Sequence, residues 1–189
     1  MNTKPKLLWI GDIVAKTGFA RVTENVLPFI KDDFDITVLG NNWWGDPSPL
    51  QKIYTMYPSS NRFQTAPFGE ERIREIVMKI EPDIIFTIND MWIVNEQYKQ
   101  IQDMHKDGRF KFVGYVPMDS YNWVGCLTDT ANDWDGIVSY TEFGAREFIK
   151  AGIEKPIAVI PHGVTEGQFY PVSKKEARKK LKLADDLFI

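Results

Sequence analysis

Near its amino terminus the sequence reads KLLWIGDIVAKTGFARV (residues 6–22), and this pattern decides the fold. Residues 7–10 form a short apolar run of the kind that makes a buried strand. After a turn, Thr17 and Gly18 open a stretch in which apolar residues recur at helical spacing over residues 19–30. A strand followed by an amphipathic helix is the first part of a βαβ unit, so the segment predicts an α/β fold.

The same alternation continues along the chain. Six more short apolar runs follow the first one, at residues 36–39, 53–57, 84–88, 112–116, 136–139 and 157–160. Between them, apolar residues recur at helical spacing within residues 73–80, 94–101 and 145–149. Strands that alternate with helical stretches favour a parallel sheet with crossover helices. We therefore predict a Rossmann-like, open and mostly parallel sheet of about seven strands, with helices on both faces.

The character of the sequence changes after the seventh run. Residues 161–173 are polar and contain proline, as domain boundaries do, and Ser173 then opens a short basic helix. A further strand pattern begins at residue 186 and is cut off at residue 189. We expect one domain over residues 1–165, then a linker, the basic helix and the truncated start of a second domain over residues 166–189.

Composition excludes several classes of protein. The 189 residues are 43% hydrophobic and 26% charged, which is ordinary for a globular chain, and the net charge of −3 argues against nucleic-acid binding. A single cysteine, Cys126, permits neither an internal disulfide nor a multi-cysteine zinc site. The apolar run at residues 7–10 is too short for a signal peptide, and no run is long enough to span a membrane. We expect a cytoplasmic protein.

In open parallel sheets, ligands bind beyond the carboxyl ends of the strands, so the loops after the predicted strands are the place to look for a site. Four of the six tryptophans and several carboxylates fall in these loops. Flat apolar rings beside hydrogen-bonding groups suit a polyhydroxylated ligand. The candidate residues are Asp12, Thr17, Gly18, Trp43, Trp44, Asp90, Trp92, Asp119, Tyr121, Trp123, His162 and Gly163.

Two interpretations stay open for several of these residues. A tryptophan in a loop can stack on a ligand or cap the end of the sheet, although Trp43 and Trp44 cannot easily both be core because neighbours on an extended chain point opposite ways. Thr17 can help to bind an anion at the helix start, or it can cap the helix. His105 lies in a polar helix end, where we expect it to be solvated. Two Asp-x-Asp triplets, at residues 33–35 and 133–135, precede strands and so belong to the opposite edge.

One further pattern carries a resemblance to a known family. Residues 137–153 (IVSYTEFGAREFIKAGI), followed by IAVIPHGV (157–164) and FYP (169–171), resemble group 1 glycosyltransferases, family 4-like, of the GT-B architecture. The turn TGFAR (17–21) looks like the glycine loop of that family. The resemblance covers nearly the whole chain, as the first of two domains.

The resemblance implies an enzyme that transfers a sugar from a nucleotide-sugar donor to an acceptor hydroxyl, with retention of configuration. Residues 1–165 would hold the acceptor, and the second domain would hold most of the donor, so the chain alone is expected to be inactive. Asp119 takes the catalytic position, and no metal or cofactor is expected. Thr17, Gly18, His162 and Gly163 are assigned to the donor phosphates, and Asp12, Trp43, Trp44, Asp90, Trp92, Tyr121 and Trp123 to the acceptor. The alternative is a stand-alone carbohydrate- or nucleotide-binding module, or a protein-interaction module, without catalysis.

Overall fold

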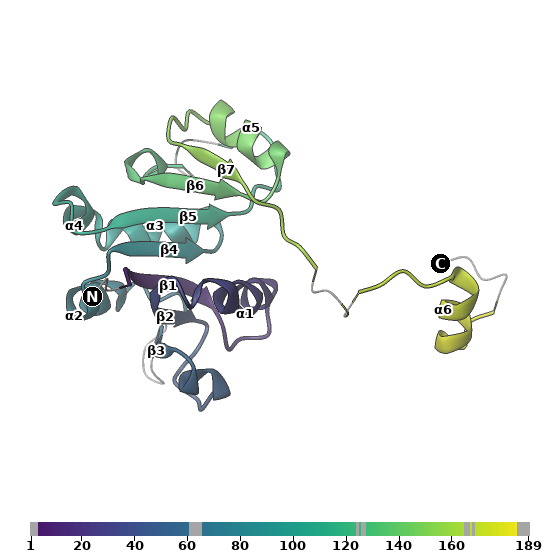
Figure 1. Ribbon diagram of the computed structural model, residues 1–189. Coiled ribbons are helices and arrows are strands. Elements are labelled where there is room, and N and C mark those ends of the chain that lie inside the picture. Colours follow the sequence, from purple (N-terminus) through teal and green to yellow (C-terminus); the bar gives the residue numbers. More distant parts are fainter. Residues whose placement is uncertain are drawn as a thin grey trace.

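A computed structural model describes residues 4–60, 66–123, 125, 128–164, 167 and 169–184. Its centre is a seven-stranded sheet in the order β3-β2-β1-β4-β5-β6-β7 (Figure 1). Every pair of neighbouring strands is parallel, which confirms the predicted Rossmann-like α/β architecture. The strands are β1 (Lys6–Asp12), β2 (Asp35–Asn41), β3 (Thr55–Pro58), β4 (Ile84–Ile88), β5 (Lys111–Val116), β6 (Gly136–Ser139) and β7 (Ile157–Val159).

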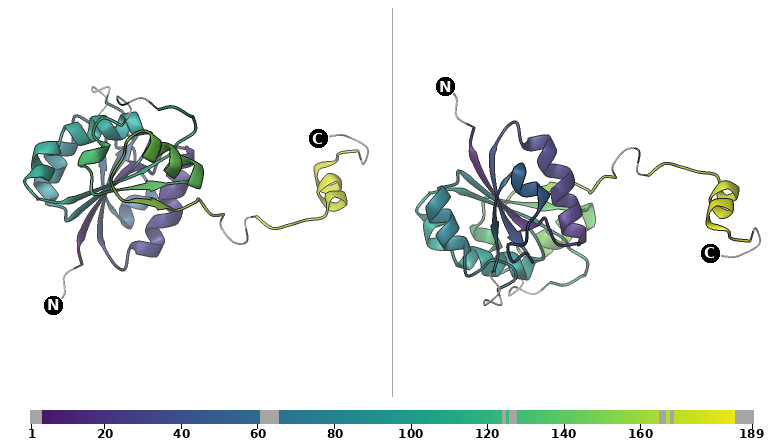
Figure 2. Two further views of the ribbon diagram at one scale, coloured as in Figure 1. Left: turned by 90° about the horizontal axis from the view of Figure 1, so that it is seen from above. Right: turned by 90° about the horizontal axis from the view of Figure 1, so that it is seen from below.

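Helices cover both faces of the sheet, but unequally. The helix α1 packs on one face, and α2, α3, α4 and α5 pack on the other. Figure 2 shows α3 and α4 on the side of the sheet opposite α1. The bounds are α1 (Gly18–Ile30), α2 (Ile73–Ile80), α3 (Met91–Lys99), α4 (Gln102–Lys106), α5 (Glu142–Lys150) and α6 (Lys174–Leu181), with 3₁₀ helices η1 (Pro49–Lys52) and η3 (Ala131–Asp133). Within the described residues, no helix is both long and apolar enough to cross a membrane.

Hydroxyl side chains fix the starts of three helices. The Thr17 Oγ1 atom accepts a hydrogen bond from the Ala20 backbone N–H at 3.1 Å, so Thr17 is the N-cap of α1. Thr141 caps α5 in the same way, and Ser173 caps the basic helix α6. Figure 1 shows α6 standing apart from the sheet, at the end of the chain that leaves β7.

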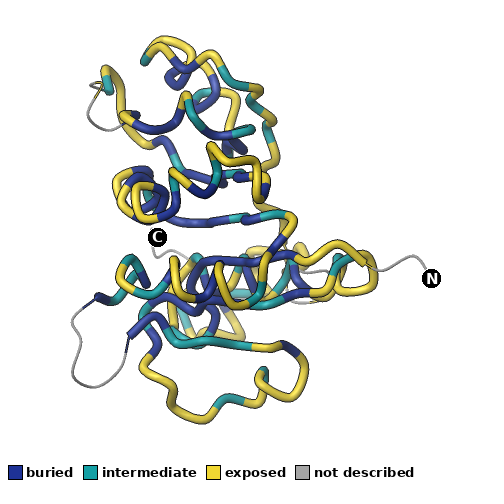
Figure 3. Tube along the Cα trace, turned by 90° about the vertical axis from the view of Figure 1, so that its left-hand side faces the viewer, coloured by how far each residue is buried: buried dark blue, intermediate teal, exposed yellow. Residues whose placement is uncertain are grey.

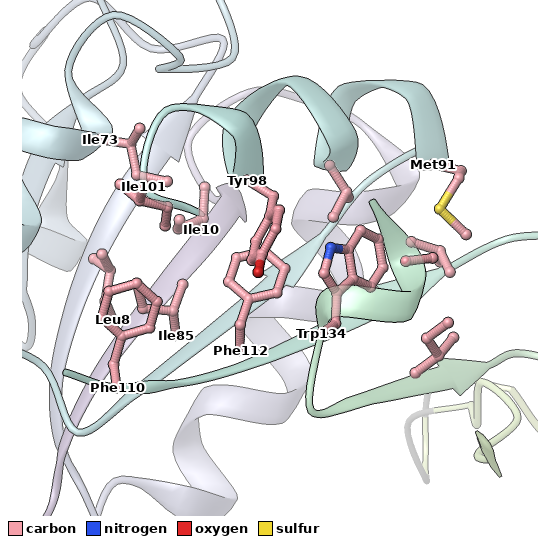
Figure 4. Close-up of a cluster of buried hydrophobic side chains, with 14 of the residues drawn as sticks. Leu8, Ile10, Ile73, Ile85, Met91, Tyr98, Ile101, Phe110, Phe112 and Trp134 are labelled. Atoms are coloured by element: carbon pink, nitrogen blue, oxygen red, sulfur yellow. The ribbon is translucent and has the colours of Figure 1, made fainter. Parts of the chain in front are cut away.

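The larger core lies between the sheet and the helices α2 to α5. The strands run through the buried interior of the molecule (Figure 3). The ring of Trp134 is fully buried, with its centroid 5.4 Å from that of Phe112 and 6.2 Å from that of Tyr98 (Figure 4). Its Nε1–H donates to Thr130 Oγ1 at 3.1 Å, so the polar atom of this buried ring is satisfied.

Gly114, in β5, lies directly under the ring of Trp134. A Cβ atom at this position would meet Trp134 Cζ3 at 2.5 Å, which is closer than carbon atoms can approach. We therefore expect Gly114→Ala to lower the free energy of unfolding by about 1–3 kcal/mol in urea denaturation. Gly136→Ala is the matched control, because its Cβ would meet its nearest neighbour, the Pro156 carbonyl oxygen, at an ordinary 3.5 Å. Equal stabilities of the two variants would contradict this prediction.

A polar network ties together the amino ends of β5 and β6. His105 Nδ1 lies 2.7 Å from the Tyr98 hydroxyl, and His105 Nε2 lies 2.7 Å from Asp135 Oδ2. Burial alone would raise the pKa of Asp135, but hydrogen bonds from Phe112, Lys111 and His105 outweigh it and lower that pKa. The expectation that His105 is solvated is wrong, because its side chain is only 11% exposed and both ring nitrogens have partners.

Candidate functional site

The loops that follow the parallel strands meet at one edge of the sheet, as the topology requires. There they enclose a pocket of about 470 Å³, which we call the polar pocket. Six residues predicted from the sequence line it: Asp12, Thr17, Gly18, Asp90, Trp92 and His162. They come from the end of β1, the start of α1, the start of α3 and the segment after β7. Asp12 and His162, which are 150 positions apart in sequence, therefore line the same pocket.

Asp12 joins three parts of the pocket wall. Its carboxylate is almost fully buried and accepts from Thr17 Oγ1 at 2.5 Å and from Asn42 Nδ2 at 2.9 Å. The Thr17 hydroxyl thus donates to Asp12 while it accepts from α1, so the capping interpretation of Thr17 is confirmed. These bonds hold the start of α1 and the loop after β2 against the end of β1.

Asp90 is a half-buried carboxylate in the wall of the polar pocket. It precedes α3 in an extended conformation, and its side chain makes no capping hydrogen bond to that helix. Partial burial raises the pKa of Asp90, and the negative charge of Asp119 raises it further. The Asn89 side chain accepts from the Asp90 backbone N–H at 2.9 Å and orients the loop. A carboxylate that is partly desolvated gains from a hydroxyl donor that a ligand brings.

Trp92 supplies a flat apolar surface beside Asp90. Its side chain lies in the first turn of α3, is 52% exposed and lines the polar pocket. The Phe68 ring meets it edge-on, with the two centroids 5.6 Å apart, and this contact fixes the orientation of the indole. An exposed ring held by an edge contact can stack on the apolar face of a sugar ring.

His162 forms the wall of the pocket on the side of β7. Its imidazole lies against Tyr140, with ring centroids 4.1 Å apart, and against Tyr115, with centroids 5.5 Å apart. Partial burial lowers the pKa of His162, so the ring is neutral near pH 7. The Tyr140 hydroxyl is buried and makes no hydrogen bond to any described residue.

A second hollow adjoins the first. This apolar groove, of about 520 Å³, lies on the sheet face beside α1, and His162 lines both it and the polar pocket. Its lining includes Trp9, Phe86 and Val113 from the sheet and Val22 and Val26 from α1. Gly163, to which the resemblance gives a donor-phosphate role, lines this groove and is not among the residues that line the polar pocket.

The two adjacent tryptophans after β2 point opposite ways. Trp43 is only 2% exposed: its ring packs over Gly40 and its Nε1–H donates to the Asp46 carbonyl. Trp43 therefore belongs to the core and not to the pocket lining, which corrects its predicted place in the cleft. Trp44 is 47% exposed but does not line the polar pocket.

The residues predicted after β5 also lie outside the polar pocket. The Trp123 ring packs edge-on against Phe148 of α5, and its Nε1–H donates to Ser120 Oγ at 2.8 Å. Tyr121 is exposed and packs edge-on against Phe143. Asp119 is exposed, and its negative charge raises the pKa of Asp90. The roles predicted for these three residues stay predictions.

Sequence reasoning did not select several residues that complete the site. Asn42, Asn89 and Phe68 line the polar pocket, and the ring of Tyr140 packs against the imidazole of His162. The signal for three of them was available, since Asn89 and Tyr140 directly follow predicted strands and Asn42 lies three residues after one. Phe68 lies between β3 and α2 and gives no such signal.

No family model and no curated protein matches the sequence. The solved structures that are similar in fold include two glycosyltransferases. A glycosyltransferase from Rickettsia africae ESF-5 has a TM-score of 0.61 at 17% identity, over 99% of this chain and 52% of that chain. A UDP-glucosyltransferase from Polygonum tinctorium, capable of glucosylating indoxyl and solved in complex with 3,4-dichloroaniline, has a TM-score of 0.53 at 12% identity, over 96% and 57%. The chain thus has a GT-B glycosyltransferase-like fold and spans about half the length of these two proteins.

Proposed function

We propose that this chain is the acceptor-side domain of a nucleotide-sugar-dependent glycosyltransferase, which transfers a sugar to an acceptor hydroxyl with retention of configuration. The observation that carries the proposal is the convergence of Asp12, Asp90, Trp92 and His162 on one pocket at the carboxyl edge. The fold, which two glycosyltransferase structures share, supports the same conclusion. The second half of the enzyme would supply most of the contacts to the donor.

The polar pocket has the chemistry that an acceptor sugar needs. The indole of Trp92 offers a stacking surface, and the carboxylate of Asp90 offers a hydrogen-bond acceptor beside it. Asp119 adds negative charge next to Asp90, where it would help to orient the reacting hydroxyl and to disfavour anionic acceptors. We keep Asp119 in the proposal as a candidate catalytic residue.

The donor would approach the start of α1. Gly18 lies at the amino end of this helix and lines the polar pocket, so its backbone N–H is available to a diphosphate oxygen. The hydroxyl of Thr17 is already committed to Asp12 and to the helix. No metal or cofactor is part of the proposal.

We expect nucleotide-sugars to bind this chain only weakly, in the millimolar range, which corresponds to ~4 kcal/mol or less. The described residues that line the polar pocket include no lysine or arginine to hold a diphosphate. Calorimetry with a panel of nucleotide-sugars measures the affinity, and release of free nucleotide reports turnover.

Micromolar binding or measurable turnover by these 189 residues would place the donor site within them. It would contradict the proposal that the second half of the enzyme supplies most contacts to the donor. An enzyme that carries this domain and transfers no sugar from any donor, while the domain binds glycosides, would favour a carbohydrate-binding module instead.

A further inference from the structure

The segment after β7 is held on the sheet by aromatic contacts that centre on His162. Tyr115 Oη donates to the Ile160 carbonyl oxygen at 2.6 Å and anchors the segment just before the histidine. The Tyr115 and Tyr140 rings pack edge-on, with centroids 4.5 Å apart, and the imidazole contacts both of them. The position of the imidazole in the wall of the polar pocket is thus set by two tyrosines from neighbouring strands.

We propose that Tyr140, together with Tyr115, is a positioning residue that holds the His162 imidazole in the wall of the polar pocket, where it binds a hydroxyl of an uncharged, polyhydroxylated ligand and not a phosphate. This inference rests on the proposed function, because it names the class of ligand that the acceptor pocket takes. It also revises the phosphate-binding role that the sequence resemblance implies for His162.

The charges around His162 support this assignment. The carboxylates of Asp12 and Asp90 line the same pocket as His162, whereas Arg21 of α1 is among the described residues that line the apolar groove and not among those that line the polar pocket. A neutral imidazole carries one N–H donor and one nitrogen acceptor, which together match the donor and acceptor of a hydroxyl group. Two carboxylates and an uncharged ring would repel a phosphate or leave it without a counter-charge.

The ring of Tyr140, and not its hydroxyl, makes the positioning contact. The hydroxyl has no hydrogen-bond partner among the described residues, and burial, Tyr115 and Asp90 all raise its pKa, so it stays protonated. A buried hydroxyl without a partner costs free energy, which phenylalanine at this position would not incur. Tyr140→Phe should therefore keep the ring that packs against the His162 imidazole. Tyr140→Ala and Tyr140→Leu remove this ring contact.

The chain has only two histidines, so NMR can follow each imidazole separately. We expect the titration midpoint of His162 to lie below that of an exposed histidine in the wild type and in Tyr140→Phe. In Tyr140→Ala and Tyr140→Leu it should rise towards that of an exposed histidine, because the imidazole gains access to water. The His105 resonances report the fold, since His105 contacts Tyr98 and Asp135 far from this edge. Midpoints that are equal in all four folded proteins would overturn the positioning role of Tyr140.

Two added probes test the class of ligand. Pyrophosphate should leave the midpoint of His162 unchanged, because an anion bound at the ring would favour the protonated form and raise the midpoint. Methyl glycosides and polyols at about 100 mM, a concentration that populates a complex of millimolar affinity, should shift the His162 resonances with at least one member of the panel.

A raised midpoint in pyrophosphate, or no response to any glycoside or polyol, would overturn the inference. The transfer assay is independent of both results. Transfer with a pyrophosphate-responsive His162 leaves the proposed function intact, and glycoside binding at His162 without transfer leaves only this inference intact.

Discussion

Replacement of Asp90 by alanine is expected to lower kcat/KM for sugar transfer by about 10- to 150-fold in the complete enzyme, which corresponds to about 1.5–3 kcal/mol. The change removes a charged hydrogen-bond acceptor from the polar pocket but disturbs no helix cap, because the Asp90 side chain does not cap α3. Steady-state kinetics of transfer measure the effect, and the same substitution should weaken glycoside binding by this chain.

Asp90→Asn should change stability and activity in opposite directions. A carboxyl whose pKa is raised in the folded protein destabilises the fold above that pKa and has no effect below its unfolded value near 3.8. Asp90→Asn should therefore make the protein slightly more stable at pH 7 while it lowers turnover. The stability gain should disappear as the pH falls below the unfolded pKa. A neutral or destabilising effect at pH 7 would show that the carboxylate is not desolvated.

Asp119→Asn is the comparison variant at the candidate catalytic position, and it removes the neighbouring carboxylate that does not line the pocket. If Asp119→Asn abolishes transfer and Asp90→Ala leaves it unchanged, the catalytic position that the resemblance implies is correct and the emphasis on Asp90 is wrong.

Trp134→Ala should lower the free energy of unfolding by about 3–5 kcal/mol, the largest effect on stability that we expect from one substitution. The fully buried ring fills the space over Gly114 and packs on Phe112 and Tyr98, so its loss leaves a cavity. Urea denaturation measures the change. Trp44→Ala, at a half-exposed position, should stay within about 0.5 kcal/mol of the wild type. Similar losses in the two variants would refute the assignment of Trp134 to the core.

The sheet was predictable because strands buried on both faces appear as short apolar runs, which stand out between helical stretches. All seven predicted strands occur in the structure, and only local bounds differ. Residue 53 was assigned to the third strand, but η1 continues to Lys52 and β3 begins at Thr55. The place of the polar pocket followed from the parallel topology, which brings Asp12, Asp90, Trp92 and His162 to one edge of the sheet.

The direction of individual side chains was not predictable in the same way. Alternation argues against the burial of both Trp43 and Trp44 but does not say which of them is buried. Contacts with Gly40 and Asp46 decide it for Trp43. His105 is satisfied by Asp135, which lies 30 residues further along the chain. No local pattern contains that pairing, because it depends on the register between β5 and β6.

The two edges of the sheet differ in how well their polar side chains are satisfied, and this difference bears on protein engineering. The network of His105, Asp135 and Tyr98 braces the amino edge with satisfied hydrogen bonds, whereas Asp90 and Tyr140 at the opposite edge each carry an unfavourable burial. Loops at the carboxyl edge can therefore be exchanged with those of another protein of this fold without touching the bracing. Chimaeras that replace only exposed residues of these loops, such as Trp44 and Trp92, and keep the buried Trp43, Met91 and Ile93 should keep the thermal stability of the parent while they take on the acceptor preference of the loop donor.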